Sequence, residues 1–326
     1  MNIIGEHIDY LGGVVLPFAC DLELRLEARP WRREVRLASD ELPGEARVPL
    51  DGSAEPPAGW GRHVWGVVET LRAEGIPIEG VRGTIRSSIP VGAGLSSSAA
   101  LEVAVALAVT GGRMPDPVVL ARAELLATGV PVGVMDQATL LNARAGHALL
   151  LDCRTREFEH VPIHPNVGFV LIDTETRREL ADGRYAERRG EVEAAFRRSG
   201  ASSLDQLDAA HIDDRRLRHA VSEQRRVRDA VPALRAGDVE ALGALVSASH
   251  RSLRDDFEVS SPALDAAVVA AEALPACTGA RLVGAGFAGC IVAVIESGRE
   301  QEFIDDSYRI PHQFASVRAV DAAGEN

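Results

Sequence analysis

Three short stretches of the chain combine glycines, hydroxyls and carboxylates at spacings that suit the binding of an anion and a polyol. The first is 90–100 (PVGAGLSSSAA), which follows a strand-like run and precedes an apolar run long enough for a buried helix. Its glycines and serines leave backbone N–H groups free at the positive end of a helix dipole, which favours phosphate. A glycine-rich turn with a serine N-cap has the same composition. The segment therefore predicts one of these two structures.

The second stretch lies near the N-terminus, at 5–13 (GEHIDYLGG). Glu6, His7 and Asp9 place three polar side chains within four residues, and their single imidazole does not suit zinc. Polar groups packed this tightly suit hydrogen bonding to a polyol, because each hydroxyl needs both a donor and an acceptor. An ordinary surface turn is the structural alternative.

The third stretch, 284–289 (GAGFAG), matches the G-x-G-x-x-G pattern of dinucleotide-binding folds. Such a fold needs a helix next, whereas 290–295 (CIVAVI) is a β-branched run typical of a strand. The pattern therefore predicts a tight glycine turn between two strands, at which the backbone comes close to a ligand.

Two carboxylates, Glu124 and Asp136, follow the glycine-serine stretch and are candidates for metal and base chemistry. Phosphoryl transfer needs Mg²⁺ held by one or two protein oxygens, and a group that orients the attacking hydroxyl and accepts its proton. Two solvated acids at helix ends are the alternative.

Overall charge and amino-acid usage restrict the possible ligands and cofactors. The 326 residues carry a net charge of −13, which argues against nucleic acid or an anionic membrane as a partner. The sequence has no lysine, which excludes Schiff-base chemistry, pyridoxal phosphate and the lysine-containing P-loop. A phosphate group must then be held by backbone N–H groups, a helix dipole, a metal ion or arginine.

The cysteines and the terminus indicate a cytoplasmic protein. The four cysteines are far apart in the sequence and form no C-x-x-C pair, which fits a reducing compartment. The N-terminal residues lack the basic and apolar regions of a signal peptide. The longest apolar run, 99–109, is too short to span a bilayer and contains Glu102.

Periodicity and turn signals predict two domains, 1–163 and 164–326, which meet at the proline-rich break 162–166. The predicted helices are 63–73, 101–109, 117–128, 185–198, 205–230 and 239–253. The predicted strands are 22–27, 81–86, 147–152, 168–173, 280–283 and 290–295. Residues 39–60, rich in proline and glycine, are predicted to form a loop, and 321–326 a frayed end.

The segments 5–10, 90–100 and 284–289 resemble, in this order, the three signature motifs of the GHMP small-molecule kinases. The galactokinase branch of that family is the nearest match. Four further segments are similar to galactokinase segments, so the resemblance runs nearly from end to end: 132–137 (VGVMDQ), 146–154 (GHALLLDCR), 185–189 (YAERR) and 249–258 (SHRSLRDDFE).

The resemblance implies a two-domain α+β fold, with an N-terminal S5-like α/β domain and a C-terminal ferredoxin-like domain. It also implies an activity, the ATP-dependent phosphorylation of the anomeric hydroxyl of D-galactose to galactose 1-phosphate. Mg²⁺ would be the cofactor, with ATP as co-substrate. The protein would act as a monomer on a small-molecule sugar.

The resemblance also implies roles for individual residues, carried over by position. The ATP phosphates would be wrapped by the residues of one loop: Gly92, Ala93, Gly94, Leu95, Ser96, Ser97 and Ser98. Ser98 and Glu124 would ligate Mg²⁺, and Asp136 would act as base or as an orienting anion. Trp60 would lie near adenine. The sugar would be held by residues from three segments: Glu6, His7, Ile8, Asp9, Gly133 and Tyr185.

Two departures from the family pattern bear on these expectations. Relatives read Gly-Arg-Val-Asn before the first motif, and here Met1 falls on the Val and Asn2 on the Asn. We therefore expect the natural chain to extend upstream through an arginine. Ile8 and Leu11 also replace the Thr and Asn common in galactokinases. A kinase for another sugar, such as N-acetylgalactosamine or arabinose, and a non-catalytic regulator that binds sugar and ATP are the alternatives.

Overall fold

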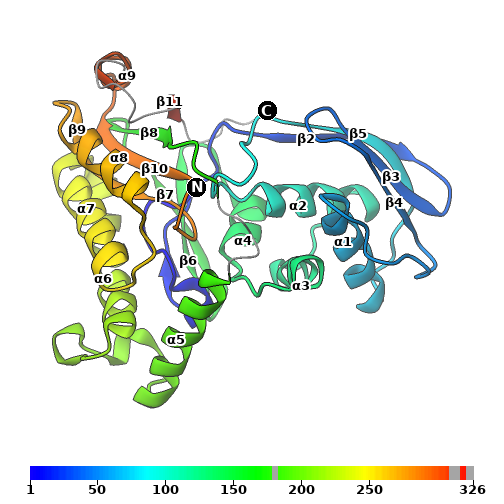
Figure 1. Ribbon diagram of the computed structural model, residues 1–326, viewed down its shortest axis with the longest axis horizontal. Helices are drawn as coiled ribbons and strands as arrows, with labels where there is room; N and C mark the ends of the chain where they lie inside the picture. The colour runs from blue at the N-terminus through cyan, green and yellow to red at the C-terminus, as the bar shows by residue number, and fades with distance from the viewer. Residues whose placement is uncertain (178–182, 308–315, 321–326) are drawn as a thin grey trace. The chain divides into compact units, whose positions relative to one another are not determined.

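A computed structural model describes residues 1–177, 183–307 and 316–320 of the chain (Figure 1). The chain forms two compact units, each made of segments that are separate in the sequence. Unit 1 comprises Met1–Asp21, Val91–Leu95 and Ala143–Asn326, and unit 2 comprises Leu22–Pro90 and Ser96–Asn142. Unit 1 draws on both sides of the predicted domain boundary at 163 and 164, which stays a prediction.

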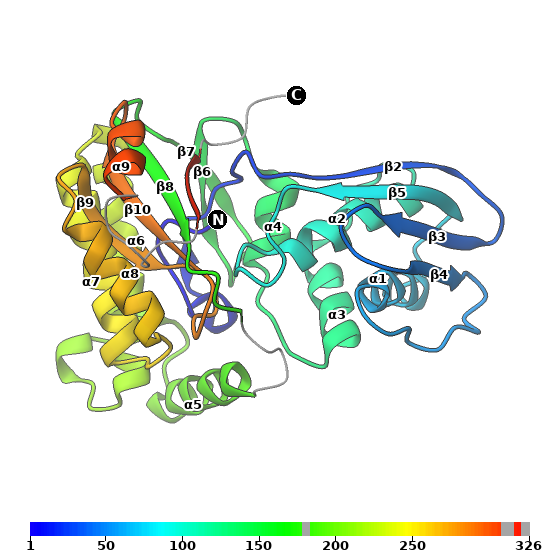
Figure 2. The same ribbon diagram turned by 45° about the horizontal axis from the view of Figure 1, so that its top comes forward.

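The sheet of unit 2 has four strands in the order β2-β5-β3-β4 (Figure 2). Their bounds are Leu24–Pro30, Val81–Ser87, Glu34–Ser39 and Glu45–Pro49, and β3 pairs in parallel with β5. The predicted strand 81–86 is confirmed. The predicted loop 39–60 is wrong at β4, because Ala46 and Val48 alternate with polar residues and are buried in the core of unit 2.

Four helices belong to unit 2: α1 (Gly61–Ala73), α2 (Ser97–Val109), α3 (Pro117–Thr128) and α4 (Met135–Asn142). Helices α1 and α2 pack against the same face of the sheet, where Leu37 and Val48 meet a shared apolar core (Figures 1 and 2). Helix α3 begins and ends as predicted, since Asp116 accepts a hydrogen bond from Val118 N–H and Gly129 adopts a left-handed conformation.

The larger sheet of unit 1 has the order β11-β8-β10-β9, and its neighbouring strands are all antiparallel. The bounds are Val167–Asp173 for β8, Cys277–Leu282 for β9, Cys290–Glu296 for β10 and Ser316–Val320 for β11. Helices α7 (Val239–Asp255) and α8 (Pro262–Glu272) precede β9 and pack on β9 and β10, and α9 (Glu300–Ser307) precedes β11 (Figure 1). This strand order and alternation are those of a ferredoxin-like sheet, so the predicted α+β fold is confirmed.

The rest of unit 1 contains a three-stranded sheet of β1 (Val14–Val15), β6 (His147–Asp152) and β7 (Phe158–Pro162), and the helices α5 (Arg184–Ser199) and α6 (Arg215–Ala236). The predicted helix 205–230 is wrong at its start. Asp214 caps α6 by accepting from Arg216 and Leu217 N–H, and the preceding segment forms two short 3₁₀ turns. Residues 321–326 lie outside the described residues.

Two glycines allow α7 and β9 to approach closely. A Cβ on Gly279 would lie 2.0 Å from the carbonyl oxygen of Gly243, and one on Gly243 would lie 2.4 Å from the backbone of Thr278. Because β9 leads into the turn 284–289, this contact fixes the strand that carries the third motif.

We expect Gly279→Ala to lower the free energy of unfolding by about 1–3 kcal/mol, since the added methyl group has no space. Gly190→Ala is the matched control, because a Cβ there meets nothing within 4 Å in helix α5 and should be neutral or stabilising by about 0.5–1 kcal/mol. Urea unfolding of both variants measures the difference, and equal stability of the two would contradict the close approach.

Candidate functional site

The first motif is held in unit 1 by a buried carboxylate. Glu6 is 2% exposed, and its Oε1 accepts hydrogen bonds from the Arg281 guanidinium (2.9 Å) and from Gly284 N–H (2.9 Å). Arg281 is fully buried and donates its other N–H groups to three backbone carbonyls, those of Asn2, Ile3 and Leu282. This single carboxylate joins the N-terminal segment to β9 and to the glycine turn 284–289.

Helix α6 fixes the backbone of the same motif. His219 Nε2 lies 3.2 Å from the Glu6 carbonyl oxygen, which can only accept, so Nε2 carries the proton. His219 Nδ1 then accepts from the Ser252 hydroxyl at 2.9 Å. Glu223, one turn further along, accepts from Gly5 N–H (2.9 Å). The first motif is thus tied to α6 through buried groups.

His219 and Glu223 are each kept in one protonation state. Burial lowers the pKa of His219 to about 4, so the imidazole is neutral at neutral pH. Burial alone would raise the pKa of Glu223, but neighbouring positive charge, chiefly that of Arg226 at 2.7 Å, lowers it to about 2. The motif therefore rests on a neutral imidazole and an ionised carboxylate.

Aromatic rings surround His7, the second residue of the predicted polar cluster. His7 Nε2 donates to the Ala285 carbonyl (3.2 Å), so its Nδ1 accepts from the Tyr10 hydroxyl (3.1 Å). The imidazole lies 4.6 Å from the Phe257 ring and 5.8 Å from the Tyr185 ring, centre to centre. The structure thus brings Tyr185, from α5, to the first motif.

The glycine segments 92–95 and 284–289 pack backbone to backbone in unit 1. A Cβ on Gly284 would lie 2.8 Å from the Gly94 carbonyl oxygen, and one on Gly289 would lie 2.6 Å from that of Ala93. Both glycines have positive φ, which any side chain would disfavour. The segment 284–289 is followed by β10, so the predicted strand-to-strand turn is confirmed.

Each of the three motifs also holds one non-glycine residue in the left-handed region. These residues are His7 (φ 62°), Ser96 (φ 57°) and Phe287 (φ 66°). Such conformations cost about 1–2 kcal/mol and persist where surrounding contacts impose them. The three motifs are therefore held in shapes that their own sequence does not favour.

The start of helix α2 carries Ser96, Ser97 and Ser98 in unit 2. Within the described part of the chain, Ser96 forms no side-chain capping bond with the first turn of α2. Ser96 is the N-cap residue of α2 but does not cap it through its hydroxyl, so both alternatives for this segment stay predictions. The backbone N–H groups at this helix end point along the positive end of the dipole, which favours an anion.

Ser98 and Glu124 meet in unit 2, although they come from different helices. The Ser98 hydroxyl donates to Glu124 Oε1 (2.8 Å), and the Gln137 amide donates to Oε2 (2.8 Å). Burial and the neighbouring carboxyl groups of Glu102 and Asp136 raise the pKa of Glu124 to about 7, against a smaller lowering by the Ser98 hydroxyl. Glu124 is thus a buried acid with two directed donors, and the alternative of a solvated helix-end acid is wrong for it.

Asp136 lies in the first turn of α4 and is partly exposed. Its charge acts on both Glu102 and Glu124 and raises the pKa of each. The structure thus places the two predicted carboxylates of unit 2 close enough for the charge of Asp136 to raise the pKa of Glu124.

The other predicted residues occupy varied surroundings. Ile8 is fully buried, and its carbonyl accepts from the N–H groups of Leu11 and Gly13. Trp60 lies at the start of α1 and donates to the Pro43 carbonyl (3.1 Å). Gly133 lies two residues before α4, and Asp9 begins a 3₁₀ turn.

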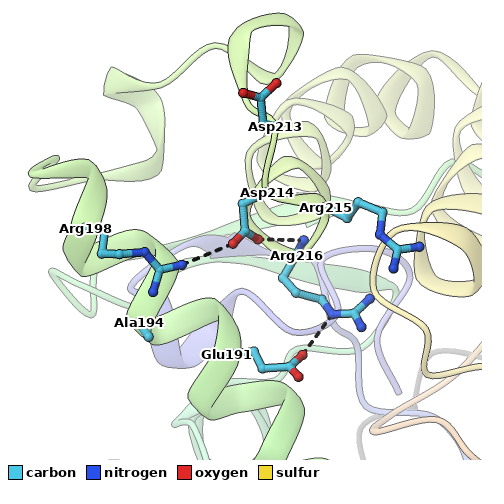
Figure 3. Close-up of a pocket in the computed structure, with 7 residues that line it drawn as sticks. All are labelled: Glu191, Ala194, Arg198, Asp213, Asp214, Arg215 and Arg216. Carbon is cyan, nitrogen blue, oxygen red and sulfur yellow. Dashed lines mark hydrogen bonds and ion pairs between the residues drawn. The ribbon is translucent and has the colours of Figure 1, made fainter.

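A hollow between α5 and α6 lies apart from the predicted residues (Figure 3). Arg198 pairs with Asp214 (3.3 Å), and Arg216 pairs with Glu191 (3.0 Å). These charged side chains form ion pairs with one another, and none of them belongs to a predicted motif. We therefore interpret the hollow as a surface lined by structural ion pairs.

Sequence reasoning missed the residues that support the motifs: His63, Glu102, Gln137, His219, Glu223 and Arg281. Two of them could have been recognised from the sequence, because Glu102 interrupts an apolar helix and Arg281 interrupts an apolar strand. A charge inside a buried run must be neutral or paired.

Comparison with known proteins identifies the family. Family models match at 62–143 (GHMP kinases N terminal domain), 230–309 (GHMP kinases C terminal) and 1–30 (Galactokinase galactose-binding signature). A galactokinase of Roseiflexus sp. is 40% identical over 96% of this chain and 85% of that protein, and the human galactokinase is 37% identical over 99% and 89%. The chain belongs to the galactokinase family of the GHMP kinases.

Solved structures agree with this assignment. The crystal structure of Lactococcus lactis galactokinase complexed with galactose superposes with a TM-score of 0.89 at 30% identity, over 98% of this chain and 91% of that one. The Methanococcus jannaschii mevalonate kinase reaches 0.73 at 20% identity, which shows the common fold. No helix of the described residues is long and apolar enough to cross a membrane.

The neutral state of His219 predicts a pH dependence of stability. In the unfolded chain the imidazole takes up a proton below its ordinary pKa of 6.5, while in the folded chain it does so only near 4. Stability should therefore fall as the pH drops from 6.5 to 4, by up to about 1.4 kcal/mol per pH unit from this group. Glu223 adds to the loss at lower pH, between 4.5 and 2.

His219→Gln should weaken this dependence, because the amide keeps a donor for Glu6 but does not titrate. Urea unfolding between pH 4 and 7 measures the slope. His211→Gln is the control, since His211 is exposed, with 83% of its side chain accessible. An unchanged slope in His219→Gln would show that His219 is not held neutral.

Proposed function

We propose that the protein transfers the γ-phosphoryl group of ATP to the anomeric hydroxyl of D-galactose and forms galactose 1-phosphate. The observation that carries the proposal is the match of residues 1–30 to the galactose-binding signature. In this chain the buried Glu6–Arg281 pair holds the matched segment. The relatives that match nearly the whole chain are galactokinases.

Ser98 and Glu124 fit a magnesium ion by their chemistry. Mg²⁺ prefers oxygen ligands and is held by one or two protein oxygens together with phosphate oxygens and water. The hydroxyl and the carboxylate lie 2.8 Å apart, and a cation would favour the ionised form of a carboxyl whose pKa burial has raised. When bound, such an ion would offset the negative charge of the phosphate groups.

We assign the remaining roles by residue. The backbone of 92–98 holds the phosphate groups, and Asp136 accepts the proton of the sugar hydroxyl or orients that hydroxyl as an anion. Asp9 and Tyr185 are partly exposed and bind the sugar hydroxyls directly. Glu6 and His7, almost fully buried, shape that surface. The assignments of Ile8 and Gly133 to the sugar, and of Trp60 to adenine, stay predictions.

The setting of the enzyme is also a proposal. Its four cysteines, Cys20, Cys153, Cys277 and Cys290, are free thiols, which supports a reducing compartment. We propose that the protein works in the cytoplasm, as a monomer.

The test of this function is ADP release in a coupled assay over a panel of free sugars. We expect D-galactose to be preferred over D-glucose, because the two sugars differ at one stereocentre and unpaired buried polar groups penalise the wrong epimer. Equal kcat/KM for the two sugars would refute the assignment. A preference for N-acetylgalactosamine or arabinose would make the protein a kinase for that sugar, and no turnover with any sugar would make it a binding regulator.

Asp136→Asn should keep sugar and ATP binding and lose turnover by about two to four orders of magnitude, the usual scale for loss of a general base. Calorimetry measures binding, and the coupled assay measures kcat. Asp51→Asn, at an exposed position of unit 2, is the control and should match the wild type. Near-wild-type turnover of Asp136→Asn would overturn its role.

A further inference from the structure

Unit 2 buries a second carboxyl, which the proposed chemistry does not use. Glu102 on α2 is 0% exposed, and its Oε1 lies 2.8 Å from His63 Nδ1 on α1. Its Oε2 is buried and has no hydrogen-bond partner within the described ranges. Burial raises the pKa of Glu102 to about 9, against a smaller lowering by the Gln137 amide.

Gln137 connects this carboxyl to Glu124. Its Nε2 donates to Glu124 Oε2 at 2.8 Å, and the same amide interacts with the Glu102 carboxyl. The other amide atom, Gln137 Oε1, is buried and meets no donor among the described residues. Glu102 and Gln137 thus each hold a buried oxygen without a hydrogen-bond partner among the described residues, and an unpaired buried acceptor costs free energy.

The charges around Glu102 oppose its ionisation. Asp136 already places negative charge beside it. His63 supplies no compensating cation, because burial lowers its pKa and leaves the imidazole neutral at neutral pH. An ionised Glu102 would therefore add negative charge beside that of Asp136, and Glu102 Oε2 and Gln137 Oε1 would both stay unpaired acceptors.

We propose that Glu102 is a neutral carboxylic acid that positions the metal-ligating carboxylate of Glu124 through Gln137. The Glu102 hydroxyl donates to Gln137 Oε1, and its carbonyl oxygen accepts from His63 Nδ1–H. Gln137 Nε2–H then donates to Glu124, which also accepts from the Ser98 hydroxyl. These contacts give a partner to both oxygens that otherwise have none, Glu102 Oε2 and Gln137 Oε1. The role of the contacts in metal binding rests on the proposed function.

Infrared difference spectroscopy of the whole protein, without nucleotide or metal, tests the protonation state. Glu102→Gln keeps the size, the neutral charge and the ability to donate to Gln137 and accept from His63. We expect this variant to lose one carboxylic-acid C=O band at neutral pH relative to the wild type. Glu69→Gln, at a carboxylate paired with Arg72 on α1, is the matched control and should lose a carboxylate band instead. Loss of no acid band in Glu102→Gln would overturn the proposal.

Calorimetry of Mg²⁺ binding in the presence of a non-hydrolysable ATP analogue tests the positioning role. Glu102→Gln should bind the ion within about threefold of the wild type, while Glu102→Met should lose about 10–100-fold in affinity, the usual effect of removing an outer-shell partner. Gln137→Met breaks the same link and should lose as much, which keeps the test valid if Glu102→Met does not fold. Equal losses in Glu102→Gln and Glu102→Met would contradict the proposal.

These measurements separate the inference from the function on which it rests. Both read binding or vibrational signals and need no turnover. A wild-type protein that shows the acid band and the expected order of Mg²⁺ affinities, but phosphorylates no sugar, would refute the proposed function and support the positioning role of Glu102.

Discussion

The burial of carboxyl groups is the constraint on which both ligand-facing regions depend. A carboxylate out of contact with water is retained only if hydrogen-bond donors or opposite charge replace its hydration. Unit 1 supplies arginine, since Glu6 pairs with Arg281 and Glu223 with Arg226. In unit 2, burial raises the pKa of Glu102 and Glu124 instead. The same physical cost therefore gives fixed negative charges in one unit and, in the other, acids that need a proton or a cation.

The use of arginine for this purpose follows from the sequence, which contains no lysine. A guanidinium offers five donors in a planar fork, whereas an ammonium offers three on a flexible stem. Arg281 uses its fork to reach Glu6 and the carbonyls of Asn2 and Ile3, so one buried side chain holds a side chain of the first motif and the backbone just before it. A lysine at this position would leave buried carbonyls without donors.

Much of the fold could be predicted because local patterns agree with the tertiary structure. The strand 147–152 and the helix 117–128 have clear apolar runs and turn signals, and both occur with those bounds. The errors arose where the local composition concealed a strand or a helix cap. Proline and glycine around β4 concealed its alternating buried residues, and the charged run before α6 concealed the cap at Asp214, which sets where the helix begins. Neither error moves a predicted site residue.

The candidate site residues could be proposed from residue type, but the contacts that connect them could not be predicted. The motifs indicate Ser98, Glu124 and Asp136, yet nothing in their spacing shows that Gln137 bridges Glu124 to Glu102, because these residues meet only when three helices pack. The sequence does contain one sign of this network, because the acid Glu102 interrupts the apolar run of α2. A helix can keep such an acid in its core only if neighbouring elements satisfy it. The acid that interrupts the apolar run of α2 is therefore a reason to look for a polar network beside the proposed metal ligands.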